Sequence, residues 1–500
     1  MGALRQFPAF VVLLLVASAL MLLPALHAVR LHAWPAAQSF TYHAVFFGVL
    51  SIILGLATMN RQPRAAARYH LSTLLLSYIL LPLLLAAPIL PLVPGLGLGG
   101  GYFEMLSCLT TTGATLFERP NLVAEPVHLW RALVGWMGGL MVLVTAFSIL
   151  APLNLGGFEI GLGSSSLRDA ARSGTMEEAS ARILRVLRQI TPIYVGLTAA
   201  LALALFLAGD RAFVAICHAM GTLSTSAISP VGGIAGAQSG RLGEVAILLF
   251  LLPAVSHRGF SLDSRRRAGP RLSDPQMQLM LITVLGVTAV LFLHSFVGAA
   301  EIERQHNLAA AFRAIWGSAF TVLSFLTTTG FVSEDWRSAQ LWSDLPEPGI
   351  ILLGVAVMGG GIATTAGGVK LLRLYALYRH GLREMDKLVH PSSIGRRGQG
   401  DALINRGGAR IAFMFLMLTL IALALMMLAF TATGLSFRHG LTLAVAGLTT
   451  TGPAIRVVGE GFGYADLTAI PRAIFCAGMI VGRVEVLVIV ALFNPVYWRR

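Results

Sequence analysis

Four short segments of this 500-residue chain are variants of one threonine-rich pattern, and their oxygen atoms could hold a cation. In each segment a Leu is followed by a run of Thr and Ser residues. Aligned on the residue that follows the last Thr, the segments are separated by 113, 104 and 122 residues, so they form an internal repeat. The four segments are Leu109–Thr115, Leu223–Ser229, Leu326–Val332 and Leu448–Ala454.

The chemistry of these segments fits an ion filter. A monovalent cation that sheds its water needs a ring of oxygen atoms, and backbone carbonyl groups supply one at low cost. Glycine permits the positive φ angles that turn successive carbonyls toward one axis. No ring of Asp or Glu accompanies the segments, which favours a carbonyl-lined filter over a carboxylate one. The predicted ion-filter residues are Thr111, Thr112, Gly113, Thr225, Ser226, Thr328, Thr329, Gly330, Thr450, Thr451 and Gly452.

The rest of the chain predicts an all-α polytopic membrane protein. Apolar residues make up 56% of the sequence and charged residues only 12%, and the mean hydropathy is +0.76. A soluble chain would carry about twice that charge. Apolar stretches of ~17–25 residues are long enough to cross a bilayer as helices. Ten such spans are predicted, near residues 8–29, 40–59, 70–91, 128–151, 187–208, 242–260, 277–298, 349–369, 410–432 and 471–494.

Shorter apolar segments precede the four Thr-rich segments and are predicted to be half-helices that enter the membrane and return as an extended loop. Irregular backbone at that depth is tolerated where it lines a water-filled cavity or packs inside protein. The order span, half-helix, loop, span recurs four times, which predicts four parallel units around a central pore. The half-helices are expected at 101–109, 211–223, 309–326 and 436–448, and the units at 63–165, 166–268, 269–395 and 396–500, after a two-span prefix at 1–62.

The charge distribution predicts the orientation of the chain. Most of the 37 basic residues fall between alternate predicted spans, and acidic clusters fall in the other loops. Basic loops are typically cytoplasmic, which places both termini in the cytoplasm. The net charge of +14 therefore reflects membrane-edge loops rather than nucleic-acid binding. A retained first span is favoured over a signal peptide, because no clean cleavage site follows the apolar run.

At the Thr-rich segments and at four further motifs, the chain resembles the superfamily of potassium transporters that contains the TrkH, KtrB and plant HKT proteins. The resemblance extends over essentially the whole chain. The two-span prefix and the length favour the TrkH branch over the shorter KtrB branch. The further motifs are His128–Gly139, Ala215–Met220, Gly359–Lys370 and Gly482–Glu485.

The resemblance implies potassium uptake across a bacterial inner membrane, without enzymatic chemistry. The inside-negative potential contributes ~2.3 kcal/mol per charge per 100 mV. Potassium would be the substrate, and this chain would hold no cofactor. The resemblance also implies a homodimer and a separate TrkA-like cytoplasmic subunit, on which any regulatory nucleotide would bind. The polar segment Asn154–Arg188 could dock that subunit, with a plain surface loop as the alternative.

A glycine-rich motif and an intramembrane arginine are candidates for a gate. Five glycines in ten residues disfavour a continuous helix, since each costs up to ~1 kcal/mol relative to Ala, and the resemblance implies a movable loop below the filter. Close helix packing is the alternative. Arg483 lies inside the last predicted span, where an ionisable residue is usually functional, although it could simply satisfy a buried partner. Lys370 and Arg373 are expected to snorkel to the cytoplasmic edge. The candidate gate residues are Gly359, Gly360, Gly361, Gly367, Gly368 and Arg483.

Ser226 leaves the ion preference open. In the alignment above it stands where the resemblance implies a filter glycine, and in plant HKT relatives a serine at such a position goes with sodium permeation. Sodium or mixed sodium and potassium permeation is therefore the nearest alternative, while a serine without effect also stays open. An alternating-access secondary transporter, which commonly has inverted repeats, is a more distant alternative. A membrane enzyme is the least favoured, because the sequence offers no nucleophile–base pair or metal cluster.

Overall fold

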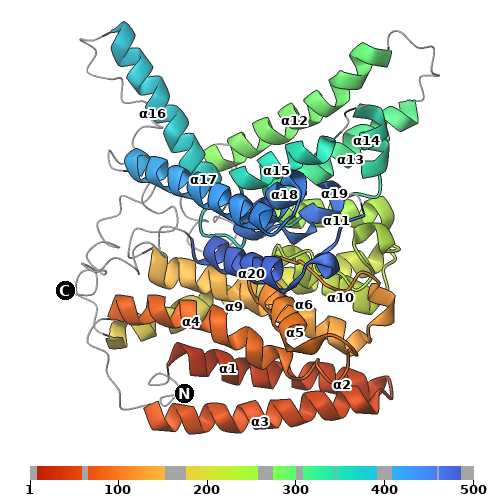
Figure 1. Ribbon diagram of the computed structural model, residues 1–500, viewed down its shortest axis with the longest axis vertical. Coiled ribbons are helices and arrows are strands. Elements are labelled where there is room, and N and C mark those ends of the chain that lie inside the picture. The colour runs from red at the N-terminus through yellow and green to blue at the C-terminus, as the bar shows by residue number, and fades with distance from the viewer. Residues whose placement is uncertain are drawn as a thin grey trace.

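The predicted all-α class is confirmed, because all regular structure in the described residues is helical. The structure is a computed structural model, and most of its helices lie side by side with their axes roughly parallel or antiparallel (Figure 1). The described residues are 8–58, 66–151, 176–256, 274–299, 308–343, 345, 347–390, 408–458 and 461–485. The proposed docking segment, Asn154–Arg188, lies outside them up to residue 175.

A recurring order of a long helix, a short helix, a Thr-rich loop and another helix defines units one and two. An N-terminal pair of helical segments precedes them and lies at one edge of the molecule (Figure 1). The preceding helices are α1 (Ala9–Leu20), α2 (Leu22–Arg30) and α3 (Trp34–Thr58). Unit one contains α4 (Ala66–Ala86), α5 (Gly97–Leu109), α6 (Glu125–Thr145) and a π-helical turn at Ala146–Leu150. Unit two contains α9 (Met176–Leu207), α10 (Ala212–Leu223) and α11 (Gly240–Leu251), with 3₁₀ turns at Ile234–Gly236 and Leu252–Ala254.

Units three and four repeat the same order with additional short helices. Unit three contains α12 (Pro275–Ala299), α13 (Leu308–Leu326), α14 (Trp336–Ser343), α15 (Pro348–Met358) and α16 (Leu371–Val389). Unit four contains α17 (Gly408–Ala432), α18 (Phe437–Thr449), α19 (Ile455–Val458) and α20 (Ala469–Val484). Further 3₁₀ turns lie at Pro120–Leu122, Gly452–Ala454 and Tyr464–Asp466.

The four predicted half-helices are present as α5, α10, α13 and α18, and each ends at a Thr-rich loop. Their C-terminal ends agree with the prediction to within one residue, because a left-handed residue stops each helix two residues after the segment's Leu. The third half-helix differs in length. Its described core, Ala309–Leu326, has 18 residues and is by itself long and apolar enough to cross a membrane.

Among the described residues, seven helices are long and apolar enough to cross a membrane, or eight if α14 and α15 form one broken span. Six of the seven coincide with predicted spans, and the seventh is α13. The other four predicted spans contain the helices α4, α11, α15 and α20, of 21, 12, 11 and 16 residues. In α15 the reason is clear: Gly359, with φ 74°, ends the helix at Met358, well before residue 369.

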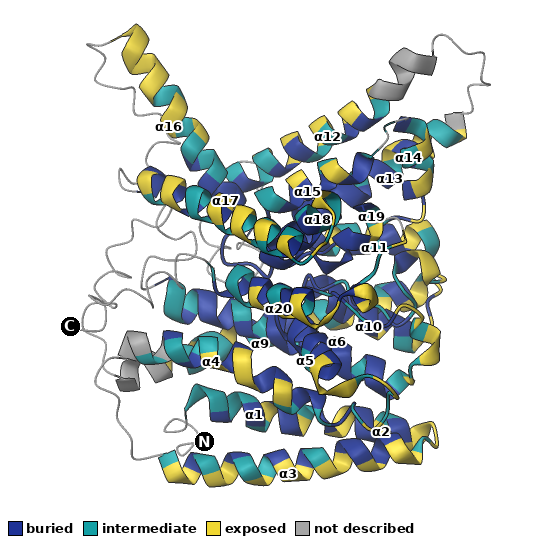
Figure 2. Ribbon diagram, in the orientation of Figure 1, coloured by how far each residue is buried: buried dark blue, intermediate teal, exposed yellow. Residues whose placement is uncertain are grey.

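Burial separates the lipid-exposed helices from the half-helices. The half-helix α18 is buried over its last turns, whereas α3 and α17 expose large apolar side chains such as Phe46 and Leu428, 61% and 64% exposed. Figure 2 shows this contrast as dark interior helices and lighter peripheral ones. Helices that are apolar on their exposed face are suited to lipid rather than to water. The chain is a multi-pass membrane protein whose half-helices are buried in their C-terminal turns.

Candidate functional site

The four Thr-rich loops share one backbone conformation. The second hydroxyl residue of each loop is left-handed, with φ of 55° at Thr111, 53° at Thr225, 54° at Thr328 and 57° at Thr450. For a residue with a side chain this conformation costs on the order of 1 kcal/mol, and such outliers cluster at binding sites. The same costly conformation at four equivalent positions indicates a shared structural requirement.

Hydrogen bonds define the register of the four loops. In each loop, the N–H that follows the left-handed residue donates to the carbonyl group five residues earlier, in the last turn of the half-helix. The side chain of the same residue also lies 2.8–3.0 Å from the hydroxyl two residues before it. The residues that make both contacts are Thr112, Ser226, Thr329 and Thr451.

The alignment of the second loop from sequence was wrong by one residue. Ser226 is equivalent to Thr112, and Ala227, with φ 48°, occupies the position of Gly113 and Gly330, with φ 75° and 83°. The error arose because the alignment used the last Thr of each segment. In the second loop the residue equivalent to that Thr is a serine, Ser226. The residue that replaces glycine in this loop is therefore an alanine.

The fourth loop leaves the common path after Thr451. Gly452 begins a 3₁₀ turn instead of taking a positive φ, and its N–H donates to the carbonyl O of Thr112 at 2.7 Å. The Tyr464 hydroxyl donates to the carbonyl O of Gly452, also at 2.7 Å. Pro453 restricts the turn, because its ring fixes φ. Loop four is thus joined directly to loop one.

Contacts between successive loops close a ring. A side chain at Gly113 would lie 1.8 Å from the carbonyl O of Ser226, which joins units one and two. The rings of His218 and Phe331 pack edge to face at 5.9 Å and join units two and three. Gly330 lies against Pro453, which joins units three and four, and the contact of loop four with loop one completes the ring. Units two and four therefore lie on opposite sides of it.

The ring concentrates oxygen atoms away from solvent. The first three hydroxyl residues of all four loops are at most 2% exposed. Thr111 Oγ1 is buried without a hydrogen-bond partner, as expected of an oxygen that ligates a cation or water. The C-terminal ends of four half-helices add partial negative charge. No group of three or more His, Cys, Asp or Glu side chains that could hold a metal is found within the described ranges, so the candidate ligands are hydroxyl and carbonyl oxygens.

A buried ion pair holds the first loop in place, and the sequence analysis missed its acidic member. Glu104 is fully buried in α5 and lies 2.7 Å from the guanidinium of Arg131 in α6. Its oxygens also accept hydrogen bonds from the Thr115 hydroxyl and the Leu116 N–H. A carboxylate inside an apolar segment is costly unless it is paired, and that signal could have identified Glu104.

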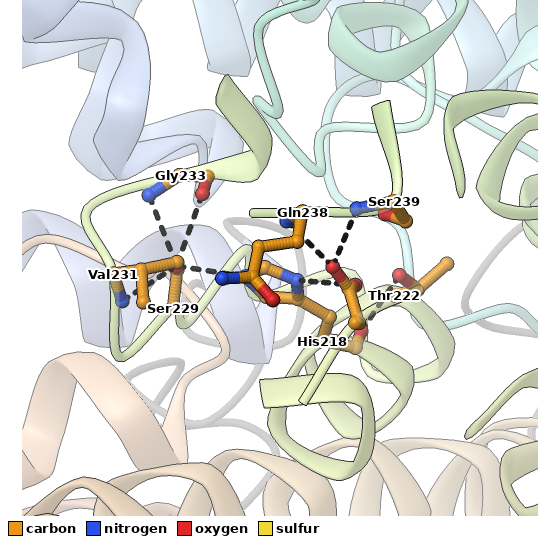
Figure 3. A network of polar contacts seen from close by, with 8 residues as sticks. His218, Thr222, Ser229, Val231, Gly233, Gln238 and Ser239 are labelled. Carbon is orange, nitrogen blue, oxygen red and sulfur yellow. Dashed lines mark hydrogen bonds and ion pairs between the residues drawn. The ribbon is translucent and has the colours of Figure 1, made fainter. Parts of the chain in front are cut away.

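A different network holds the second loop (Figure 3). His218 Nε2 lies 2.8 Å from the Ser229 hydroxyl, and that hydroxyl accepts the N–H groups of Val231 and Gly233. His218 Nδ1 lies 3.9 Å from Asp210 Oδ2. Burial raises the pKa of Asp210. The nearby His218 and the hydrogen bonds that the carboxylate accepts from backbone N–H groups lower the pKa by more than that, so it lies below its ordinary value. The group is therefore a carboxylate at neutral pH.

The third loop is held from the neighbouring unit. Glu244 in α11 of unit two is fully buried and accepts hydrogen bonds from Trp316 Nε1 at 2.6 Å, the Ser333 hydroxyl at 2.8 Å and the Glu334 N–H at 2.7 Å. The sequence analysis missed this residue as well. Like Glu104, it is an acidic residue inside a predicted apolar segment, and its partners are 72 to 90 residues away in the chain.

The Gly-rich loop at 359–370 lies against the ring. The Thr365 hydroxyl donates to the carbonyl O of Leu223 at 3.3 Å, and the Gly367 N–H donates to Thr328 Oγ1 at 2.7 Å. Close packing at the glycines is observed: a side chain at Gly359 would lie 2.7 Å from Cα of Gly368. The glycines therefore permit close approach of loop backbone to loop backbone.

Arg483 contacts the Gly-rich loop, whereas the expected snorkelling of Lys370 and Arg373 was wrong. Arg483 Nη1 donates to the carbonyl O of Thr365 at 2.7 Å. Lys370 is buried and donates to a backbone carbonyl, and Arg373 is fully buried, with Nη2 3.0 Å from Glu485 Oε2. The guanidinium of Arg373 also covers the Phe415 ring at 3.6 Å. Both side chains point inward because they form polar contacts with the loop backbone and with Glu485. The spacing of residues in the sequence does not predict these contacts.

Interrupted helices that bring buried, oxygen-rich loops together define the class of this molecule, a multi-pass membrane transport protein. The chain belongs to the TrkH family of cation transport proteins. The family model described as TrkH, a cation transport protein, matches residues 256–499. The Trk system potassium uptake protein TrkH of Salmonella typhimurium is 31% identical over 414 residues, 81% of this chain and 80% of that protein.

Other relatives cover still more of the chain. The Trk system potassium uptake protein TrkI of Halomonas elongata is 27% identical over 474 residues, 91% of each chain. The crystal structure of the potassium transporter TrkH from Vibrio parahaemolyticus has the same fold, with a TM-score of 0.82 and 22% identity over 99% of this chain and 100% of that one. The similarity in fold therefore includes the N-terminal helices and all four units.

Proposed function

We propose that the protein takes up potassium through a channel-like pore whose filter is the ring of four Thr-rich loops. The observation that carries this proposal is the ring itself: four loops with the same left-handed threonine, closed by contacts from each unit to the next. The relatives named as potassium uptake proteins support potassium as the substrate. The units are then those at 63–165, 166–268, 269–395 and 396–500, with 1–62 outside the pore.

In this proposal the filter ligands are backbone carbonyls of the loops, supplemented by threonine and serine hydroxyls. The residues are those predicted from sequence, with Ala227 added at the glycine position of the second loop. A ring of carbonyl dipoles replaces the hydration shell of the ion. The membrane potential drives uptake, so the chain needs no chemical reaction and no cofactor of its own.

The Gly-rich loop and Arg483 are proposed as the gate. The loop contacts units two and three directly at Leu223 and Thr328, so it lies against the ring. Arg483 donates to the same loop through Thr365 and adds a positive charge beside it. Displacement of the loop would open the path and remove the arginine from its partner.

Sodium or mixed permeation stays a second candidate, and Ala227 is the observation that favours it. The methyl group and the smaller φ of Ala227, 48° against 75° and 83° in loops one and three, can turn one carbonyl away from the axis. Ser226, the residue first considered, keeps the hydroxyl pairing seen in the other loops. Residue 227, rather than residue 226, is therefore the position in loop two expected to affect ion selectivity.

We further propose a bacterial inner-membrane location with both termini in the cytoplasm, a homodimer, and regulation by a TrkA-like subunit that binds the nucleotide. The distribution of basic residues supports the orientation. The relatives named as parts of a Trk system support a partner subunit.

Cation flux into proteoliposomes tests the proposal, with potassium, rubidium, sodium and lithium compared. Potassium and rubidium should pass well ahead of sodium. If Ala227 weakens selection, the variant Ala227→Gly should raise the potassium preference, and Ser226→Gly should not. Equal flux of all four ions in every variant would contradict a filter. Absence of flux both alone and with a TrkA-like subunit would contradict the pore.

A further inference from the structure

One arginine joins the chain segments that follow loops four and two. Arg456 in α19 lies four residues after Gly452, and its Nη1 donates to the carbonyl O of Gly232, which lies five residues after Ala227. These residues belong to units four and two, which are on opposite sides of the ring. The hydrogen bond joins residues 224 apart in the chain. The Arg456 side chain therefore joins the segments that follow loops four and two.

The charge of Arg456 is not neutralised by a carboxylate. Its side chain is exposed, and no ion pair to it is found among the described residues. A half-buried arginine close by, Arg438, differs in this respect, because its Nη1 lies 3.1 Å from Glu347 Oε1. Both arginines border a cavity of about 250 Å³ that Glu347 also lines. Arg456 thus presents a net positive charge at the ring, with open space on one side.

The segment whose carbonyl group accepts the hydrogen bond from Arg456 also contacts unit one. Gly232 has φ 84°, and a side chain there would lie 3.5 Å from Pro120 Cγ. Segments that follow three of the four loops therefore converge at this point. Under the proposed orientation it lies at the outer entrance of the pore.

We propose that Arg456 is a fixed positive charge at the outer entrance, which limits the access of cations to the filter and excludes divalent cations more strongly than monovalent ones. The inference rests on the proposed function. A positive side chain beside a pore raises an electrostatic barrier to cations. Coulomb energy is proportional to the charge of the ion, so the factor by which Arg456 lowers access for Mg²⁺ is the square of the factor for potassium.

The test is potassium influx at low ionic strength into proteoliposomes that contain the full-length protein, for wild type, Arg456→Gln, Arg456→Lys and the control Arg438→Gln. Arg456→Gln should raise influx roughly 3- to 15-fold, as expected for loss of a unit charge some 5–10 Å from the ion path. Arg456→Lys keeps the charge and should stay near wild type. Arg438→Gln should also stay near wild type, because Glu347 already neutralises that charge.

Two further readouts separate an electrostatic role from a structural one. The gain from Arg456→Gln should vanish in ~1 M N-methylglucamine chloride, where the Debye length is about 3 Å. External Mg²⁺ should inhibit Arg456→Gln and not wild type. If Arg456→Gln and Arg456→Lys change influx alike, or neither changes it, while wild type carries potassium, the inference is overturned and the proposed function stands. A wild type that carries no cation overturns both.

Discussion

Loops one and two have nearly the same backbone but differ in the residues that produce it. Thr111 and Thr225 have φ of 55° and 53°, and the following hydrogen bonds to the half-helix match in both loops. Loop one has glycine at residue 113 and is held by the buried Glu104–Arg131 ion pair. Loop two has alanine at residue 227 and is held by His218 and Ser229.

The comparison indicates that the path of a loop is set by the end of its half-helix and by the groups that hold its far side. Glycine is required only where a neighbouring backbone leaves no room. At Gly113 the carbonyl of Ser226 fills the space that a side chain would need, whereas Ala227 has room for its methyl group. Substitutions at four positions test this difference between the loops, in order of decreasing expected effect.

Gly113→Ala should abolish most transport. The added Cβ would lie 1.8 Å from the Ser226 carbonyl O, and that contact is with backbone, which cannot rotate away. Strain from φ of 75° adds ~1–2 kcal/mol. We expect potassium flux to fall by more than about tenfold, from overpacking of this kind. The matched control is Gly99→Ala in α5, the half-helix that precedes this loop, where no atom lies within 4 Å of the added Cβ; a similar loss there would show that the effect is not local to the ring.

Glu104→Gln should be the most destabilising change among the groups that hold the loops. It leaves the Arg131 guanidinium buried without its charged partner, which typically costs ~3–5 kcal/mol. Thermal unfolding in detergent measures the loss. The double variant with Arg131→Gln should recover part of it, because the unpaired charge is then removed. A double variant whose loss is the sum of the two single losses would contradict direct coupling.

Ser229→Ala should destabilise loop two by about 1–3 kcal/mol. Its hydroxyl bonds His218 and two backbone N–H groups, and all three would lose their partner. The equivalent residue in loop one, Thr115, bonds Glu104 and a single N–H. Thr115→Val should therefore cost less than Ser229→Ala in the same unfolding measurement. The reverse order would mean that the His218 network contributes less than the distances indicate.

Ala227→Gly should change stability least, by under about 1 kcal/mol. Relief of the left-handed conformation, ~1 kcal/mol, is offset by the greater backbone entropy of glycine in the unfolded chain. A small shift in melting temperature, together with a measurable change in the ratio of potassium to sodium flux, would show that residue 227 acts on the ion path. A large stabilisation would instead reveal strain that the surrounding contacts do not relieve.

Much of the fold could be predicted from sequence, because its signals are local. Apolar length predicts most spans, and the Thr-rich repeat predicts the ends of α5, α10, α13 and α18 to within one residue. The candidate loops were found for the same reason: hydroxyl residues and a small residue at one spacing are a short-range pattern. The resemblance at the further motifs led to the family, which the relatives then confirmed.

Sequence signals therefore identify the membrane class and the loops that form the candidate site, and they predict four units. Only the tertiary structure decided that Ala227 rather than Ser226 stands at the glycine position, because hydrogen bonds to the half-helix set the register. It also decided the contacts of Glu244 with Ser333 and of Arg456 with Gly232, 89 and 224 residues apart. Contacts between residues so far apart in sequence depend on how the units pack around the ring, and they cannot be predicted from the spacing of residues along the chain.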